Sequence, residues 1–89
     1  MKPAQQIALM DKIIRELDDL RNSQTAVLKK ISQIEADNIN LSSDLLNKGL
    51  PGIHEEVDDA VQKITALIEP FTEFRNVYAN DHPIIEEEA

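Results

Sequence analysis

The chain has 89 residues, enough for one small domain and too few to bury a large apolar core. It carries 9 Lys and Arg against 17 Asp and Glu, and this net charge of −8, with 3% aromatic residues, excludes a nucleic-acid binder that works by neutralising phosphates. The lack of Cys excludes disulfides, thiolate metal sites and a cysteine nucleophile, so stability has to come from packing or from partners.

The sequence has no targeting or membrane-spanning signal. Its longest uninterrupted apolar run is four residues, Ile7 to Met10, whereas a helix that crosses a bilayer needs about 20. Charged residues at positions 11, 12, 15 and 16 interrupt the apolar segment near the N-terminus, so a signal peptide is not expected. We therefore expect a soluble, cytoplasmic protein without membrane insertion, although export without a cleaved signal is compatible with this sequence.

A long first helix is predicted, over residues of about 5–47. Apolar or small polar residues recur there at alternating steps of three and four, and nine of eleven such positions are apolar. These positions are Met10, Ile13, Leu17, Leu20, Gln24, Val27, Ile31, Ile34, Asn38, Leu41 and Leu45. Ile7, Ile14 and Leu28 flank this stripe and widen it beyond a two-stranded seam, which favours a helical bundle.

A second helix is predicted over residues of about 52–79, with a turn at about 48–51 between the two. Its stripe has the same spacing and includes three aromatic residues expected in the core: Val57, Ala60, Ile64, Leu67, Phe71, Phe74 and Tyr78. Gly49 suits the left-handed residue that follows a helix, and Pro51 suits the first turn of the next one. The fold class expected is therefore all-α, a long antiparallel helical hairpin.

Three segments of this plan are weak. Residues 37–44 are poor helix formers, but their apolar spacing stays in phase, so the first helix is expected to continue through them. Pro70 lies inside the second stripe, where it predicts either a kink or a separate short helix. Residues 80–89 contain Asn80, Asp81 and Pro83 followed by acidic residues, and are expected to form a flexible acidic tail.

The two predicted helices have unequal lengths, of about 64 Å and about 42 Å. The second helix would then cover the first only down to about Leu20, and would leave an apolar stripe without a partner in its own chain. This candidate partner interface consists of Ile7, Met10, Ile13, Ile14 and Leu17. We expect it to be covered by self-association into a four-helix bundle, as a homodimer or other homo-oligomer, or by another helical protein.

Gln24 and Asn38 are the two polar residues of the first stripe. A buried amide at such a position fixes register and oligomer number, because it lacks a hydrogen-bond partner in any other alignment. The alternative is that either residue lies where the seam contacts water. The first reading is favoured for Gln24, and both remain open for Asn38.

The candidates for chemistry are few. His54 and Asp58 are one helical turn apart and could hold a divalent metal, but the second His of the H-E-x-x-H pattern is missing. Residues 37–48 have the oxygen-bearing spacing of a calcium loop, with Ser42 and Lys48 in place of the required Gly and Glu. We therefore expect neither a catalytic site nor a cofactor.

Two functional readings remain. The first is a non-enzymatic helical interaction protein, such as an adaptor, chaperone or structural subunit, that acts through apolar helix packing. The second rests on charge: residues 46–89 carry three Lys and Arg against ten Asp and Glu, which suits an acidic inhibitor or antitoxin-like protein that occupies a basic site on a protein partner. Residues 84–85 followed by three Glu could also bind a partner's sheet edge, although a solvated acidic end is the favoured reading.

Overall fold

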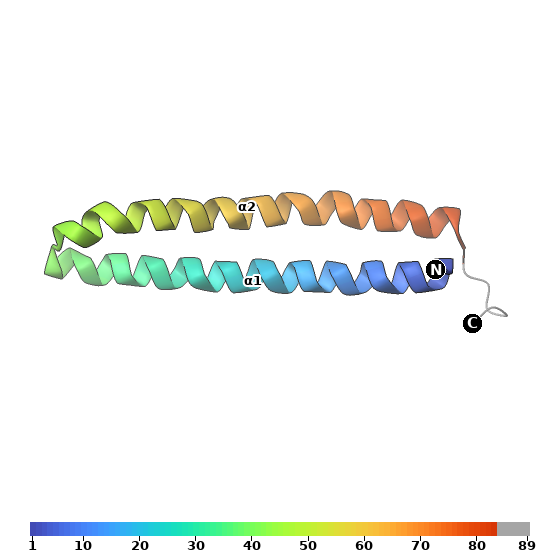
Figure 1. The fold of residues 1–89 in the computed structure, drawn as a ribbon, viewed down its shortest axis with the longest axis horizontal. Helices are drawn as coiled ribbons and strands as arrows, with labels where there is room; N and C mark the ends of the chain where they lie inside the picture. Colours follow the sequence, from blue (N-terminus) through green and yellow to red (C-terminus); the bar gives the residue numbers. More distant parts are fainter. Residues whose placement is uncertain (84–89) are drawn as a thin grey trace.

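The computed structural model describes residues 1–83, and these form an antiparallel hairpin of two long helices (Figure 1). Helix α1 spans Pro3–Leu41 and helix α2 spans Asp44–Asp81. The molecule is a rod with extents of 66 × 18 × 16 Å, and the beginning of α1 and the end of α2 lie at the same end (Figure 1). The predicted fold class, an all-α helical hairpin, is confirmed. Neither helix is both long enough and apolar enough to cross a membrane.

The predicted position of the turn is wrong. The chain reverses at Ser42 and Ser43, six residues before Gly49, and α1 stops at Leu41 instead of continuing through residues 42–47. Ser42 takes the left-handed conformation, with φ 57° and ψ 42°, and its N–H donates to the Asn38 carbonyl. The Ser43 hydroxyl caps α2 by accepting a hydrogen bond from the Leu46 N–H at 3.4 Å. Serine side chains thus satisfy backbone groups that a longer helix would have paired.

Gly49 and Pro51 lie inside α2 and form no turn. Neither glycine of the chain has a positive φ, so the conformational freedom of Gly49 is not used. Pro51 cannot donate a hydrogen bond to the Asn47 carbonyl, and its ring pushes against that carbonyl. Figure 1 shows the corresponding bend in the green first turns of α2. Leu50 between them is buried, which offsets part of the cost of two poor helix formers.

Pro70 lies within α2, so the separate short helix considered for this residue does not form. Figure 1 shows a gently curved α2 around residue 70, without the sharp kink that was the other alternative. Pro70 and Ala66 are both exposed, so the Ala66 carbonyl that loses its helical partner faces water. The helix also extends past the predicted end at residue 79 to Asp81, and residues 84–89 of the predicted tail lie outside the described residues.

Because the turn is at Ser42, the two helices have nearly equal lengths. Helix α1 has 39 residues and α2 has 38, so α2 reaches the beginning of α1. The prediction of an N-terminal stripe without a partner in its own chain is therefore wrong. Ile7 is 6% exposed, and the other four residues of that stripe are half-buried: Met10, Ile13, Ile14 and Leu17.

Candidate interaction surface

Hydrogen bonds between the helices fix their register. The Asn38 Nδ2 donates to the Asn47 Oδ1 at 2.7 Å, next to the turn. Because both helices rise by about 1.5 Å per residue, residues whose numbers add up to 85, as those of Asn38 and Asn47 do, lie opposite each other along the whole hairpin. At the open end, the ion pair between Asp11 and Arg75 agrees with this register to within one residue.

Each helix contributes two inner rows to the interface, at heptad positions a and d. On α1 they are Ile7, Ile14, Arg21, Leu28 and Glu35, with Met10, Leu17, Gln24, Ile31 and Asn38. On α2 they are Asn47, His54, Val61, Ile68 and Arg75, with Leu50, Val57, Ile64, Phe71 and Tyr78. All of these except Asn47 are buried or half-buried, which identifies the inner rows as the contact between the helices.

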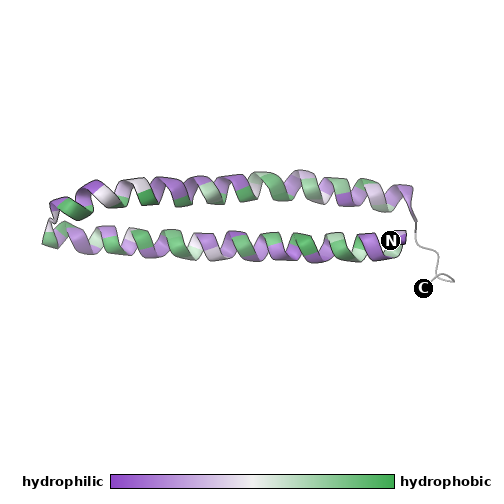
Figure 2. Cartoon of the chain, viewed as in Figure 1, coloured by the Kyte–Doolittle hydropathy of each residue, from purple (hydrophilic) through white to green (hydrophobic). Residues whose placement is uncertain are grey.

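A third apolar row on each helix, at heptad position g, is not needed for the hairpin. The outer row of α1 is Ile13, Leu20, Val27, Ile34 and Leu41, and that of α2 is Leu46, Ile53, Ala60, Leu67 and Phe74. Six of these side chains are between 42% and 57% exposed: Leu20, Val27, Ile34, Ile53, Leu67 and Phe74. Figure 2 shows apolar residues on both helices from end to end. Exposed apolar residues at a strict seven-residue spacing are a feature of helices that have a further partner.

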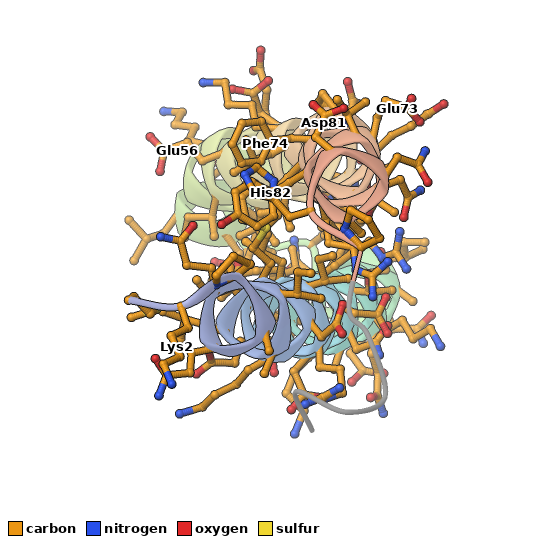
Figure 3. The ribbon with its side chains drawn as sticks, turned by 90° about the vertical axis from the view of Figure 1, so that its right-hand side faces the viewer. Lys2, Glu56, Glu73, Phe74, Asp81 and His82 are labelled. Carbon is orange, nitrogen blue, oxygen red and sulfur yellow. The ribbon has the colours of Figure 1, made fainter. Side chains whose placement is uncertain are left out.

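The two outer rows lie on the same side of the hairpin. Since α2 runs antiparallel to α1, its heptad positions follow one another in the opposite sense around the helix axis, and equal positions flank the interface on one side. Figure 3, a view along the rod from its open end, places Phe74 of the outer row on the left of α2 and Glu73 on the right. Lys2 and Glu56, which stand next to the outer rows on the helical wheel, are on the left as well. We refer to the two outer rows together as the apolar face.

The opposite side of the hairpin is polar except near the turn, where Ile39 and Pro51 are exposed. Its e-position residues include Asp11, Asp18, Thr25 and Ser32 on α1 and Asp58, Thr65 and Thr72 on α2. The Arg75 Nε and Nη2 donate to the two carboxylate oxygens of Asp11, at 2.7 and 3.3 Å. These hydrogen bonds hold the pKa of Asp11 below its ordinary value and raise that of Arg75. Arg75 therefore joins α2 to α1 at the open end of the hairpin.

Asn38 joins the two helices at the turn, the end of the hairpin opposite to Arg75. It is 5% exposed, and its Oδ1 accepts from the Ser43 N–H at 3.0 Å while its Nδ2 donates to Asn47. Because Asn38 is buried, it does not lie where the seam contacts water, and its role in fixing the register stays a prediction. Gln24 is half-buried in the layer that faces Val61, and its effect on oligomer number stays a prediction. The paired Asn38 and Asn47 were not recognised in the sequence, although both stand on inner rows.

The candidate metal residues are not brought together. The His54 Nδ1 is 2.7 Å from the Glu35 Oε1 across the hairpin, and the Asp58 Oδ2 accepts from the Gln62 Nε2 at 2.9 Å. Within residues 1–83, no group of three or more His, Cys, Asp and Glu could hold a metal ion. The calcium-loop reading of residues 37–48 does not fit either, because helices occupy the segment on both sides of Ser42 and Ser43.

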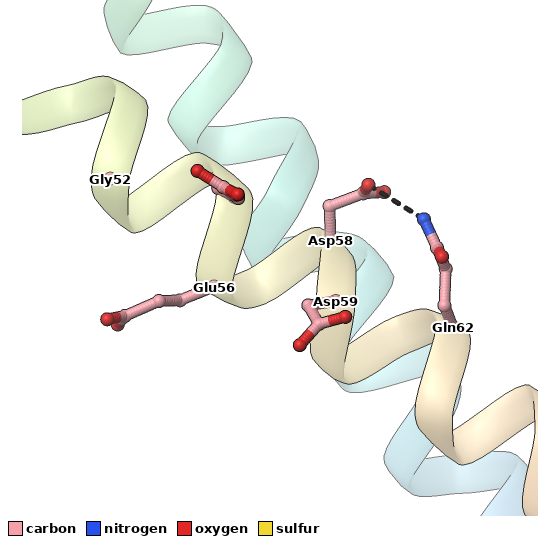
Figure 4. A pocket seen from close by; sticks show the side chains of 6 residues that line it. Gly52, Glu56, Asp58, Asp59 and Gln62 are labelled. Carbon is pink, nitrogen blue, oxygen red and sulfur yellow. Dashed lines mark hydrogen bonds between the residues drawn. The ribbon is translucent and has the colours of Figure 1, made fainter.

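An acidic cluster on α2 is the other prominent feature of the surface. It surrounds Gly52 and consists of Glu55, Glu56, Asp58, Asp59 and Gln62. Figure 4 shows that the carboxylates of Glu56, Asp58 and Asp59 point away from one another, and that Asp58 is bonded to Gln62. Carboxylates that diverge on one helix add to the negative potential of that surface but do not form a paired acid and base.

The aromatic residues only partly follow the prediction that all three belong to the core. Phe71 and Tyr78 stand on an inner row and are half-buried. Phe74 is exposed on the outer row, so its placement in the core was wrong. Its ring lies 6.1 Å from that of Phe71, centroid to centroid, and thereby continues the inner apolar surface onto the apolar face.

No protein-family model, no curated protein and no solved structure matches this chain. A hairpin of two helices carries no function by itself, because the same fold serves many unrelated purposes. Function has therefore to be inferred from this chain's own surfaces, above all the apolar face and the acidic cluster.

Proposed function

We propose that the protein is a non-enzymatic helical interaction protein, an adaptor, chaperone or structural subunit, that acts by packing its apolar face against other helices. The observation that carries this proposal is the alignment of two apolar rows on one side of the rod, from Ile13 and Phe74 to the turn. Partners of this surface would be helical, in a homo-oligomer or in a complex with another protein, because a straight apolar row complements another row of the same spacing.

Surface area supports the same proposal. The chain exposes 6805 Å², whereas a compact monomer of 10.0 kDa exposes about 5,200 Å². The difference of about 1,600 Å² on one chain is about twice the area, about 800 Å², that each partner buries in a standard protein interface. Only three apolar residues of the described chain are buried, namely Ile7, Ile31 and Leu50. A hairpin with so small a core gains stability when a partner covers its apolar face.

A second candidate is favoured by the acidic cluster of α2. Glu55, Glu56, Asp58 and Asp59 concentrate negative charge on one stretch of α2, as an acidic inhibitor or antitoxin-like protein would do to occupy a basic site on a protein partner. Of these four carboxylates only Glu56 stands beside the apolar face, so variants of the others make the two candidates separable by experiment.

The salt dependence of binding distinguishes the two candidate functions. Complexes purified with the native chain are measured by sedimentation from about 50 mM to about 500 mM NaCl, because salt screens exposed charges and leaves apolar contacts intact. Association through the apolar face is expected to hold or tighten across this range. A loss of binding by tenfold or more with rising salt, which disappears when Glu55 is changed to Gln and Asp59 to Asn, would support the acidic inhibitor instead.

A further inference from the structure

We propose that a second copy of this chain covers the apolar face, and that the turns of the two hairpins lie at the same end of the resulting four-helix bundle. This inference rests on the proposed function and specifies its partner. A two-fold axis parallel to the rod then sets α1 of each copy antiparallel to α2 of the other, in the register that Asn38 and Asn47 impose inside one hairpin.

The equal arms and the matching rows make a second copy a suitable occupant. A helix in a four-helix bundle contacts two neighbours, so it needs apolar residues at three heptad positions instead of two. Both helices have this third row, and both span almost the same length. With the turns at one end, the outer rows meet large residue to large residue, and Val27 meets the small Ala60. The facing pairs are Ile13 with Phe74, Leu20 with Leu67, Val27 with Ala60, Ile34 with Ile53, and Leu41 with Leu46.

The rows next to the apolar face, at heptad position c, decide between the two possible directions. These rim rows are Leu9, Glu16, Ser23, Lys30 and Asp37 on α1, and Gly49, Glu56, Lys63, Pro70 and Val77 on α2. With the turns at the same end, Lys30 stands beside Glu56 of the other copy, and Asp37 stands beside the other copy's Gly49. Opposite charges thus meet at Lys30 and Glu56, once on each side of the two-fold axis.

Two apolar residues of the otherwise polar rim rows also favour the arrangement with both turns at one end. Leu9 is 43% and Val77 is 49% exposed, and in this arrangement each faces the other across the interface between copies. If one hairpin were turned end for end, so that α1 packed beside α1, Leu9 would stand near Asp37. Helix α2 would then bring Lys63 beside the same lysine of the other copy. That direction would also pair Lys30 with Glu16 of the other copy, but it leaves Leu9 beside a carboxylate and places two Lys63 side chains together at the centre. The bundle with both turns at one end is therefore favoured.

Lys30 and Glu56 are available for ion pairs with another chain. Both are exposed, and among residues 1–83 neither takes part in an ion pair. Both stand on outward rows of one hairpin, so changing their charge leaves the inner rows untouched. The variants K30E and E56K therefore test the contact between copies without disturbing the fold.

The charge test measures the dimerisation of each single variant, of an equimolar mixture of the two variants, and of the double variant. Each single variant puts two like-charge pairs into its own dimer and is expected to raise the dissociation constant about tenfold. An equimolar mixture of K30E and E56K is expected to form heterodimers with the wild-type affinity, because each reversed charge then meets an opposite one. The double variant K30E/E56K is expected to dimerise like the wild type. Single variants that dimerise normally, or a mixture that stays as weak as its components, would overturn the arrangement.

Cysteine cross-linking measures the relative direction of the two hairpins independently of the charge test. The chain has no native Cys that would interfere. A mixture of L9C and V77C should form a disulfide-linked dimer upon oxidation, whereas a mixture of L9C and D37C should not. The opposite pattern would show that the hairpins are turned end for end, which overturns the inference and leaves the proposed function standing. A chain that stays monomeric and helical at high micromolar concentration would also overturn the inference. Loss of association with every helical partner would overturn the proposed function itself.

Discussion

Replacing Asn38 by Ala is expected to destabilise the hairpin at its turn. Asn38 is buried, and its amide makes two hydrogen bonds that join the end of α1 to the beginning of α2. Alanine removes both bonds and leaves the Ser43 N–H without its acceptor. Asn47 is exposed, so its side chain finds water in place of the lost partner. The main cost is therefore at the Ser43 N–H.

The magnitude follows from the count of lost bonds. Each hydrogen bond contributes about 1 kcal/mol net, and an orphaned buried donor costs about 1–3 kcal/mol, so N38A should lower the free energy of unfolding by about 2–3 kcal/mol. For a chain of this size, that corresponds to a fall in melting temperature of about 10–20 °C. N47A removes only one of the bonds and should cost about 1 kcal/mol.

The assay is thermal unfolding followed by circular dichroism at one fixed protein concentration, because oligomerisation would make the melting temperature depend on concentration. Asn40 provides the matched control, since it lies on the same turn of α1 and is exposed. N40A should melt like the wild type. The order of stability expected is N40A, then N47A, then N38A, and an N38A variant that melts within about 3 °C of N40A would refute the role of Asn38.

Three further changes have definite expected outcomes. G49A should raise the free energy of unfolding by about 0.5–1 kcal/mol in chemical denaturation, because Gly49 is helical, its φ is not positive and an added Cβ would meet nothing within 4 Å; a glycine in a left-handed turn would give the opposite sign. Q24L should raise the melting temperature, since Gln24 is half-buried on an inner row, and unchanged stability would mean that this side chain is solvated. The depressed pKa of Asp11 stabilises the fold above the ordinary carboxyl pKa of about 3.9, and this contribution disappears as pH falls through the lower folded value. R75Q should therefore show a smaller drop in melting temperature between about pH 5 and about pH 2 than the wild type, and equal drops would count against the ion pair.

The sequence predicted the two helices and their antiparallel arrangement because heptad spacing is a local and repeated signal. It misplaced the turn because Gly49 and Pro51 are strong local signals, whereas the actual turn depends on contacts that form only after folding. Asn38 reaches Ser43 and Asn47 across the reversal, and such a pairing is not visible in a local pattern. Tertiary packing of Leu50 then holds the glycine and the proline in a helix.

For a related reason, four of the five residues of the candidate interface stand on inner rows, and only Ile13 stands on the outer row. The stripe recognised on the first helix joins one inner row to the outer row. The other inner row was treated as a flank because Arg21 and Glu35 interrupt its apolar residues. Once the register is known, these polar residues belong to the interface between the helices, and Leu20, Val27 and Ile34 lie outside it. The breadth of the stripe, which was taken as a sign of a bundle, comes from this third row, whose partner is a proposal.

The central proposal, that the apolar face is the surface on which this protein associates, is tested most directly by sedimentation equilibrium of a variant of each side. L20E/L67E places two charges on the apolar face, and S32E/T65E places two on the opposite, polar side, at positions that are exposed as well. Circular dichroism first verifies that both variants are as helical as the wild type. Wild type and S32E/T65E are expected to sediment as dimers, with about twice the chain mass of 10.0 kDa, and L20E/L67E with the mass of one chain. A helical L20E/L67E variant that keeps the dimer mass, or an S32E/T65E variant that loses it, would contradict the assignment of the apolar face.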